Sequence, residues 1–233
     1  ATHCAIFCGS AAPLQFIPPM TIKTSTCGYC RLVLLLALVG AFCLPDFGHA
    51  ADGWINLFNG QNLDGWEQHS GKALYRVEDG CIVGKTVINT DNSFLCTQKQ
   101  YGDFILAFEF MVGQDMNSGV QFRSEFYTQE TEATINGKKK RRFPADRVFG
   151  YQYEIDPSPR AYTGGVYDEA RRGWLADLKE NADAQKAFKQ SEWNKARIEC
   201  QGDHIQTWIN GVKAVDFKDS MTLRGLIALQ VHQ

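Results

Sequence analysis

A segment of alternating apolar and polar residues runs from Arg147 to Asp156. Its aromatic and β-branched content predicts a β-strand, in which successive side chains point to opposite faces. Gln152, Glu154 and Asp156 would then share one face, and the tyrosines and the isoleucine between them would share the other. Carboxylates two residues apart lie about 7 Å apart along a strand, close enough to reach one ligand. The alternative for this segment is a solvated polar face on an antiparallel strand.

Other strand-like patterns predict a sheet-rich fold. Residues 103–112 carry apolar residues on both faces, so we expect a central strand that is covered on both sides. Residues 117–123 predict a strand with a second polar face, which would include Gln121 and Arg123. Turn signals recur about every ten residues, a spacing typical of a sandwich or barrel.

The second half of the chain adds a helix and two hairpins to this pattern. We predict a surface helix at residues 177–190, which are rich in alanine, and a hairpin at residues 204–217. The hairpin turns at Asn210-Gly211, a pair suited to a type I′ turn. Residues 125–147 are an insertion with five consecutive basic residues at 138–142. This run indicates a solvated hairpin tip, and the alternative is a docking patch for an anionic polysaccharide or a partner.

An apolar segment near the start of the chain has the features of a leader. Residues 32–44 are uncharged, follow Lys23 and Arg31, and precede the small-x-small sequence at residues 48–50. This arrangement predicts a signal peptide that is cleaved after Ala50, and therefore export to the periplasm or the extracellular space. At about 1.5 Å per residue the segment is too short for a hydrocarbon core of about 30 Å, so we expect no stable membrane span.

The leader divides the chain into two parts. Residues 1–50 would be an upstream extension and signal peptide, and residues 51–233 would be one β-sandwich domain. We expect no structural role for residues 1–19. A lipid anchor at Cys43 is the alternative to simple cleavage, although the bulky Phe42 stands where a small residue is expected.

Charge and cysteine content limit the function classes for residues 51–233. This part contains 22 Lys plus Arg and 25 Asp plus Glu, a formal net charge of −3. Domains that bind nucleic acid are strongly basic, so we expect no nucleic-acid partner. Three cysteines remain here, Cys81, Cys96 and Cys200. We expect at most one disulfide among them and otherwise buried thiols.

Eight motifs follow one another in the order of a known family, at residues 57–66, 77–83, 101–104, 117–123, 163–167, 192–194, 208–211 and 229–232. Together they resemble the 3-keto-disaccharide hydrolase family of bacterial secreted proteins, over residues 54–233. The resemblance implies a concanavalin A-like antiparallel β-sandwich with a ligand groove on its concave face. Family members continue into a further strand after the Gln-x-His motif, whereas this sequence stops at Gln233. We therefore expect either a missing last strand, which we favour, or an unpaired sheet edge.

The carboxylates at residues 154 and 156 do not complete the motif of a laminarinase-type glycosidase. Such enzymes use a Glu-x-Asp-x-x-Glu strand, and here Glu154-Ile-Asp156 is followed by Pro157-Ser-Pro159. The proline run leaves the sheet, because proline lacks a ladder donor, and the second glutamate is missing. Retaining glycosidases need two carboxyl groups about 5 to 5.5 Å apart around the scissile bond. We therefore expect no conventional retaining hydrolysis.

The resemblance implies a glycoside-cleaving hydrolase or lyase that acts on 3-keto-glycosides or 3-keto-disaccharides. A ketone at C3 makes the proton at C2 acidic, so the aglycone at C1 can leave by elimination and water can then add. We predict that His232 is the base and that Arg123 stabilises the enolate. Glu154 or Asp156 would be the acid, or the group that orients His232. The expected hydroxyl-binding residues are Asn117, Gln121, Gln152, Tyr167 and Gln230.

Several alternatives remain open at this stage. Arg123 could be a structural partner of Glu154, and His232 an ordinary histidine near a sheet edge. The whole chain could be a non-catalytic, lectin-like carbohydrate-binding module, since one fold hosts many functions. A conventional endoglucanase is a second alternative. We expect a carbohydrate partner and no cofactor, and the sequence leaves the question of a bound metal open.

Overall fold

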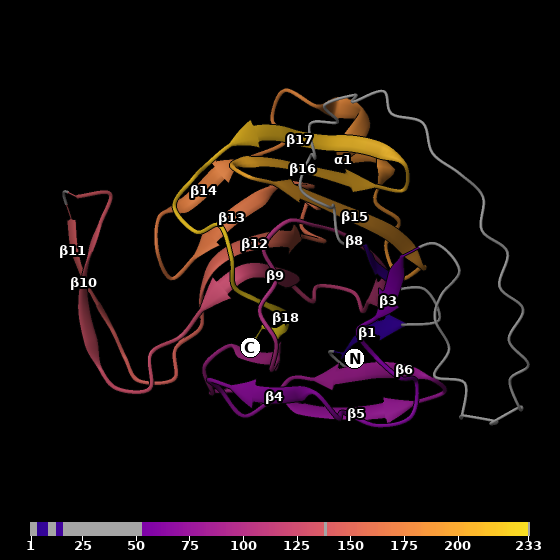
Figure 1. Ribbon diagram of the computed structural model, residues 1–233. Helices are drawn as coiled ribbons and strands as arrows, with labels where there is room; N and C mark the ends of the chain where they lie inside the picture. Colours follow the sequence, from indigo (N-terminus) through magenta and orange to yellow (C-terminus); the bar gives the residue numbers. More distant parts are fainter. Residues whose placement is uncertain (1–3, 9–12, 16–52, 138, 233) are drawn as a thin grey trace, which may run out of the picture.

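The computed structural model describes residues 4–8, 13–15, 53–137 and 139–232 (Figure 1). Within these residues the chain forms two large antiparallel sheets, a separate two-stranded hairpin and one short helix. The two sheets pack face to face, and one hydrophobic core fills the space between them. The predicted β-sandwich is therefore confirmed.

The first sheet has nine strands in the part of the chain that is described. Strands β2 and β3 pair with each other, and β2 also pairs with β8, beside the main path of the sheet. In spatial order the main path is β17 (Val212–Lys218), β16 (His204–Ile209), β15 (Asn194–Gln201), β8 (Phe104–Val112), β1 (Cys4–Cys8), β6 (Cys81–Lys85) and β5 (Leu74–Glu78), with β2 (Pro13–Gln15) and β3 (Trp54–Asn56) beside it.

The second sheet has seven strands and carries most of the residues that the sequence singled out. Its strands run in the spatial order β14 (Gly173–Ala176), β13 (Val166–Glu169), β12 (Phe149–Ile155), β9 (Ser118–Glu125), β18 (Leu226–Val231), β7 (Ser93–Thr97) and β4 (Trp66–His69). The predicted strand around residue 152 is thus β12, which lies between β9 and β13.

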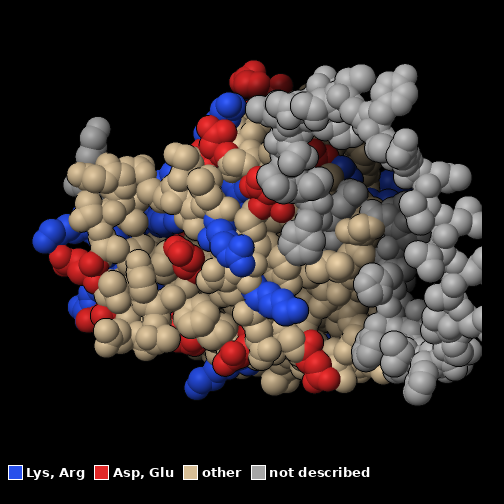
Figure 2. All heavy atoms as spheres, viewed as in Figure 1, with Lys and Arg blue, Asp and Glu red and all other residues tan. Residues whose placement is uncertain are grey.

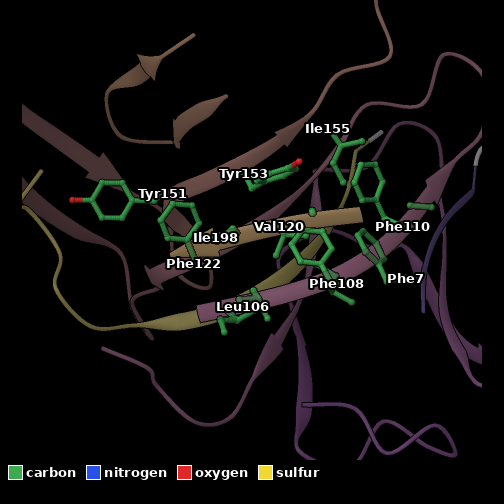
Figure 3. Packing of buried hydrophobic residues seen from close by; sticks show 14 of the residues in the cluster. Phe7, Leu106, Phe108, Phe110, Val120, Phe122, Tyr151, Tyr153, Ile155 and Ile198 are labelled. Carbon is green, nitrogen blue, oxygen red and sulfur yellow. The ribbon is translucent and has the colours of Figure 1, made fainter. Parts of the chain in front are cut away.

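The core between the sheets is rich in aromatic rings. Phe108 of β8 meets the ring of Tyr153 edge to face, with 5.6 Å between the ring centroids. Figure 3 shows this pair together with Phe110 and Val120, so both sheets contribute to the same cluster. The opposite face of β8 is only half-buried. The expectation that both faces of residues 103–112 are covered was therefore wrong.

Strands β1 and β2 come from the region for which no structural role was expected. Residues 4–8 pair with β6 on one side and with β8 on the other, so that expectation was wrong for them. The predicted apolar leader at residues 32–44 and Cys43 lie outside the described residues, and cleavage after Ala50 stays a prediction. Across the described ranges, we find no helix long and apolar enough to cross a membrane.

The helix is shorter than the sequence suggested, and the hairpins are as expected. Helix α1 (Ala182–Ala187) begins after Asn181, whose Oδ1 accepts the N–H of Ala184 at 3.1 Å. The chain becomes extended at Phe188, where its ring stacks against the core. Strands β16 and β17 join at Asn210-Gly211, and both residues have the positive φ that a type I′ turn requires.

The insertion forms an arm that projects from the sandwich. It consists of β10 (Thr131–Ile135) and β11 (Lys139–Phe143), at the far left of Figure 1. Lys140 Nζ lies 3.1 Å from Glu132 Oε1 across the hairpin, and both side chains are exposed. Figure 2 shows acidic and basic side chains interspersed on this arm. These features support the solvated-hairpin interpretation.

The cysteines of the domain do not pair with one another. Cys81 is disulfide-bonded, whereas Cys96 and Cys200 are free and buried. Burial raises the pKa of the Cys200 thiol to about 12, so this thiol is unreactive near neutral pH. Strand β18, the last described strand, lies between β9 and β7 and pairs with both, and the favoured expectation of a missing last strand stays a prediction.

Candidate functional site

The two faces of β12 have different surroundings. Tyr151, Tyr153 and Ile155 point into the core between the sheets, as the alternation predicted. Gln152 and Glu154 point to the other side and line a groove of about 410 Å³. Both are at most 5% exposed. The polar face of this strand is therefore the floor of a groove and not a solvated surface.

The groove is lined almost entirely by polar and aromatic side chains. They come from strands β12, β13, β14 and β18 and from the segments that precede β7 and β9 or follow β12 and β18. The lining residues are Asn92, Asn117, Gln152, Glu154, Arg160, Tyr167, Glu169, Trp174, Gln230 and His232. Hydroxyl-rich ligands suit such a lining, because amides, carboxylates and guanidinium groups offer both donors and acceptors.

A glycine lies between two of the residues that line the groove. Glu154 of β12 and Gln230 of β18 both lie opposite Gly119 of β9, so their Cα atoms are about 9.6 Å apart, two strand spacings. A Cβ at Gly119 would lie only 2.6 Å from Cδ of Gln152. Gln230 is 1% exposed, and its Oε1 has no hydrogen-bond partner among the described residues. This buried acceptor is suited to a ligand hydroxyl.

Glu154 is held by a chain of buried amides. Its Oε1 accepts Nδ2 of Asn117 at 2.8 Å, and its Oε2 accepts Nε2 of Gln152 at 2.7 Å. Gln121 Nε2 in turn donates to Oε1 of Gln152 at 2.7 Å, and Ser124 Oγ donates to Oε1 of Gln121 at 2.6 Å. Burial raises the pKa of Glu154, while the two amide hydrogen bonds oppose the shift. Gln121 is fully buried and supports Gln152. It does not line the groove, contrary to the prediction.

Asp156 organises a loop and holds an arginine. Its Oδ2 accepts Nε of Arg160 at 2.8 Å, and its Oδ1 accepts the N–H of Ser158 at 3.1 Å. Burial favours the neutral acid, but these hydrogen bonds outweigh burial and lower the pKa of Asp156. Asp156 does not line the groove, and its partner is Arg160. The prediction that Asp156 serves as the acid or orients His232 was therefore wrong.

Arg160 is the cation that the structure brings into the groove. Its guanidinium carbon lies 5.2 Å from the ring centre of Trp174 and 5.3 Å from that of Tyr162. The Arg160 side chain is 47% exposed, so it remains accessible to a ligand. Arg160 and Glu154 line the same groove, and the positive charge of Arg160 opposes the rise that burial causes in the pKa of Glu154.

Arg123 lies away from the groove, contrary to the prediction. Its φ is +47°, and the register of β9 shifts beside it, so the alternation of side chains is broken here. The guanidinium is fully buried and donates to the carbonyl oxygens of Gly102 at 2.9 Å and Gly202 at 2.7 Å. It also donates to Oδ1 of Asp103 at 3.0 Å. Arg123 therefore joins structural segments, and its predicted role at the enolate was wrong.

A second carboxylate lies on the side of the groove formed by β13. Glu169 is 8% exposed, and its Oε1 accepts a hydrogen bond from Nη2 of Arg147 at 2.6 Å. Burial raises the pKa of Glu169, and interactions with Arg147 and His232 oppose the shift. The main-chain oxygen of His232 accepts Oγ1 of Thr86 at 2.8 Å, which fixes the end of β18 beside the groove.

The seven-stranded sheet also carries a second, smaller apolar cluster. Phe94, Cys96 and Ala228 of the sheet form it together with Val148, which follows the insertion. Asp146 anchors this segment, because its Oδ1 lies 2.6 Å from Nδ1 of His69. In the described part of the chain, no group of three or more His, Cys, Asp or Glu residues could hold a metal ion.

The sequence found most of the lining residues but missed four. Asn117, Gln152, Glu154, Tyr167, Gln230 and His232 lie together as predicted. Asn92, Arg160, Glu169 and Trp174 were missed. The period of two along β13 could have identified Glu169, which shares a face with Tyr167. Arg160 and Trp174 carried no such signal, because each enters the groove through an irregular segment or an edge strand.

The fold is similar to that of one solved carbohydrate-binding module. The carbohydrate-binding module CBM66 from Bacillus subtilis is similar with a TM-score of 0.50 and 16% identity, covering 72% of this chain and 88% of that one. A protein of unknown function with a galectin-like fold from Bacillus subtilis has a TM-score of 0.49 and 13% identity, covering 73% and 84%. At this identity the likeness to CBM66 concerns the fold alone. A search of curated proteins found no match.

The family comparison confirms the resemblance that the eight motifs suggested. Residues 53–233 match the model of the 3-keto-alpha-glucoside-1,2-lyase-like domain. The match includes every residue that lines the groove. The chain therefore belongs to the family of 3-keto-alpha-glucoside-1,2-lyase-like domains.

Proposed function

We propose that this chain cleaves 3-keto-glycosides in the groove, by elimination followed by hydration. The observation that carries the proposal is the arrangement around Glu154, a buried carboxyl with a raised pKa that shares one groove with Arg160 and His232. The description of the family as 1,2-lyase-like agrees with an elimination between C1 and C2. The coarser conclusion, a carbohydrate-active protein, follows from the family itself.

The reaction needs three groups around the sugar. A base removes the proton at C2, and the electrons of that bond move onto the C3 oxygen as an enolate. When the enolate collapses, a double bond forms between C1 and C2 and the aglycone leaves with a proton from an acid. Water then adds across this double bond, so the net result is hydrolysis. Each proton transfer is worth about 10²- to 10⁴-fold in rate when the donor or acceptor is positioned.

His232 is the proposed base. It lines the groove at the end of β18, and its contact with Thr86 fixes the backbone from which the imidazole extends. Glu169 interacts electrostatically with His232. A carboxylate in that position stabilises the imidazolium that forms when the proton is taken.

Glu154 is the proposed acid for the departing oxygen. A general acid must hold its proton near neutral pH, and burial shifts the pKa of Glu154 in that direction. The hydrogen bonds from Asn117 and Gln152 then stabilise the carboxylate that remains after the proton is given up. The two effects keep the group usable in both protonation states.

Arg160 takes the role at the enolate that the sequence had suggested for Arg123. Its guanidinium supplies a fixed positive charge where oxygen gains negative charge, and Asp156 and the ring of Trp174 hold it in place. Tyr167 and Gln230 would bind hydroxyl groups beside Asn117 and Gln152.

A substrate panel tests the proposal. The purified chain is incubated with a 3-keto-disaccharide, the unoxidised disaccharide and laminarin, and product release is followed by mass spectrometry. We expect cleavage of the 3-keto compound alone and a loss of at least 100-fold in Glu154→Gln. Glu132→Gln is the matched control, because Glu132 is an exposed carboxylate on the arm. Glycan binding without turnover would indicate a binding module, and cleavage of laminarin would indicate an endoglucanase.

A further inference from the structure

Strand β1 fills a gap in the middle of the nine-stranded sheet. Its five residues pair antiparallel with β6 from Cys4 opposite Lys85 to Cys8 opposite Cys81. Four of them, residues 5–8, pair on the other side with β8. Figure 1 shows β1 in indigo beside β6, although the sequence places residues 4–8 at the start of the chain. Both backbone edges of this short segment are therefore used.

The side chains of β1 match the core on one face. Ala5 is fully buried and Phe7 is 5% exposed, whereas Cys4 and Ile6 on the other face are half-buried. Phe7 lies against Phe108 and Phe110 in Figure 3 and borders a cavity of about 40 Å³ that Trp66 also lines. The segment thus presents a small and an aromatic residue, two positions apart, to pockets between the sheets.

Without β1, β6 and β8 would face each other across an open gap. Backbone N–H and C=O groups at such edges need partners, and an apolar pocket would lose its aromatic ring. The segment that supplies these partners reaches β3 only through β2 and a 38-residue connection at residues 16–53. No tight turn joins β1 to either neighbouring strand, since both neighbours are distant in sequence.

We propose that the slot between β6 and β8 is a strand-binding site. Its ligand is an extended peptide segment with a small residue and an aromatic residue two positions apart, which adds to both sheet edges and places both side chains in the core. Residues 4–8 of the same chain are its occupant here. We expect this segment to stay bound after the connection at residues 16–53 is cut, and a peptide of the same pattern to replace it.

One end of this strand-binding site lies close to the groove. Cys4 pairs with Lys85 at the end of β6, and the next residue, Thr86, donates its hydroxyl to the main-chain oxygen of His232. Occupation of the slot therefore fixes the segment that holds the end of β18. This proximity does not depend on which reaction the groove performs.

The experiment begins with the folded full chain, into which a protease site has been inserted between Gly48 and His49. After cutting under reducing conditions, gel filtration at low micromolar concentration tests whether the released fragment stays with the domain. A fluorescent peptide of residues 1–10, with Cys4→Ser and Cys8→Ser, is then added in excess. We expect the fragment to co-elute, the peptide to displace it with a saturable change in anisotropy, and the Phe7→Asp peptide to bind at least tenfold more weakly.

Hydrogen exchange on the uncut chain gives an independent test that does not require the separated domain to be stable. We expect Phe7→Asp to reduce the protection of amides in β6 and β8 at least tenfold, whereas Ile6→Asp, on the half-buried face of the same strand, leaves it nearly unchanged. Separation of the fragment from a domain that keeps its melting temperature and binds no peptide would overturn the proposal. Equal protection in the parent and the Phe7→Asp chain would do the same.

Discussion

Substitution of Gly119 by alanine perturbs the centre of the groove without removing any functional group. The added Cβ would lie 2.6 Å from Cδ and 2.7 Å from Cγ of Gln152, whereas ordinary contacts begin at 3.4 Å. Gln152 must therefore move by about 0.8 Å, the difference between 3.4 and 2.6 Å. Its hydrogen bonds to Gln121 and Glu154 are both 2.7 Å long, so a shift of this size breaks or distorts them.

The effect on stability and the effect on activity should differ in size. Overpacking costs about 1 to 3 kcal/mol, and the reduced freedom of the unfolded chain returns about 0.4 to 1 kcal/mol. We expect a net loss of at most about 2.6 kcal/mol in the free energy of unfolding. A hydrogen bond to a charged group contributes about 1.5 to 3 kcal/mol, so kcat/KM should fall by about 10- to 100-fold when Glu154 loses the Gln152 contact.

The assays are urea unfolding followed by fluorescence and initial rates on a 3-keto-disaccharide. Gly102→Ala is the matched control, because a Cβ there meets only the Leu223 oxygen at 3.6 Å and the backbone is not strained. This variant should keep both stability and rate. If Gly119→Ala retains the full kcat/KM while it is folded, the amide chain does not position Glu154.

Three further predictions concern other groups of the site and its support. Burial raises the pKa of Glu154, and the protonated acid becomes scarce as the pH rises through this pKa. We therefore expect kcat to fall on the alkaline side of this pKa, and we expect the pH–rate profile of Glu154→Gln to lack that fall. Arg123→Met removes the buried partner of Asp103 and should lower the free energy of unfolding by about 3 kcal/mol, measured by urea, while kcat of the folded protein stays unchanged. Thr86→Val removes one hydrogen bond to His232 and should lower kcat about fivefold with little change in KM, and an unchanged kcat would argue against this anchoring role.

The sequence predicted the site best where the chain keeps a regular period. Gln152 and Glu154 were assigned to one face because β12 alternates without interruption over these residues. Arg123 was assigned to the same face by the same rule, but a residue with φ of +47° interrupts the alternation in β9. Nothing in the local sequence marks this position, because it holds an arginine and not the glycine that usually adopts a positive φ.

Elements whose positions depend on long-range pairing could not be predicted from the local pattern. Five residues at 4–8 carry too little pattern to predict a strand, and their partners lie more than 70 residues away in β6 and β8. Arg160 follows the proline run at residues 157–159, which was predicted only to leave the sheet. Its position depends on the hydrogen bonds that Asp156 makes within that loop, which no periodicity encodes.

Exchange of the C2 proton with solvent distinguishes elimination from direct hydrolysis of the glycosidic bond. A 3-keto-glucoside is incubated with the protein in deuterated buffer, and substrate and product are analysed by mass spectrometry and NMR. We expect deuterium at C2 of the product and a primary isotope effect with C2-deuterated substrate, both lost in His232→Ala and kept in Glu132→Gln. Complete cleavage with no deuterium at C2 and no isotope effect would contradict elimination.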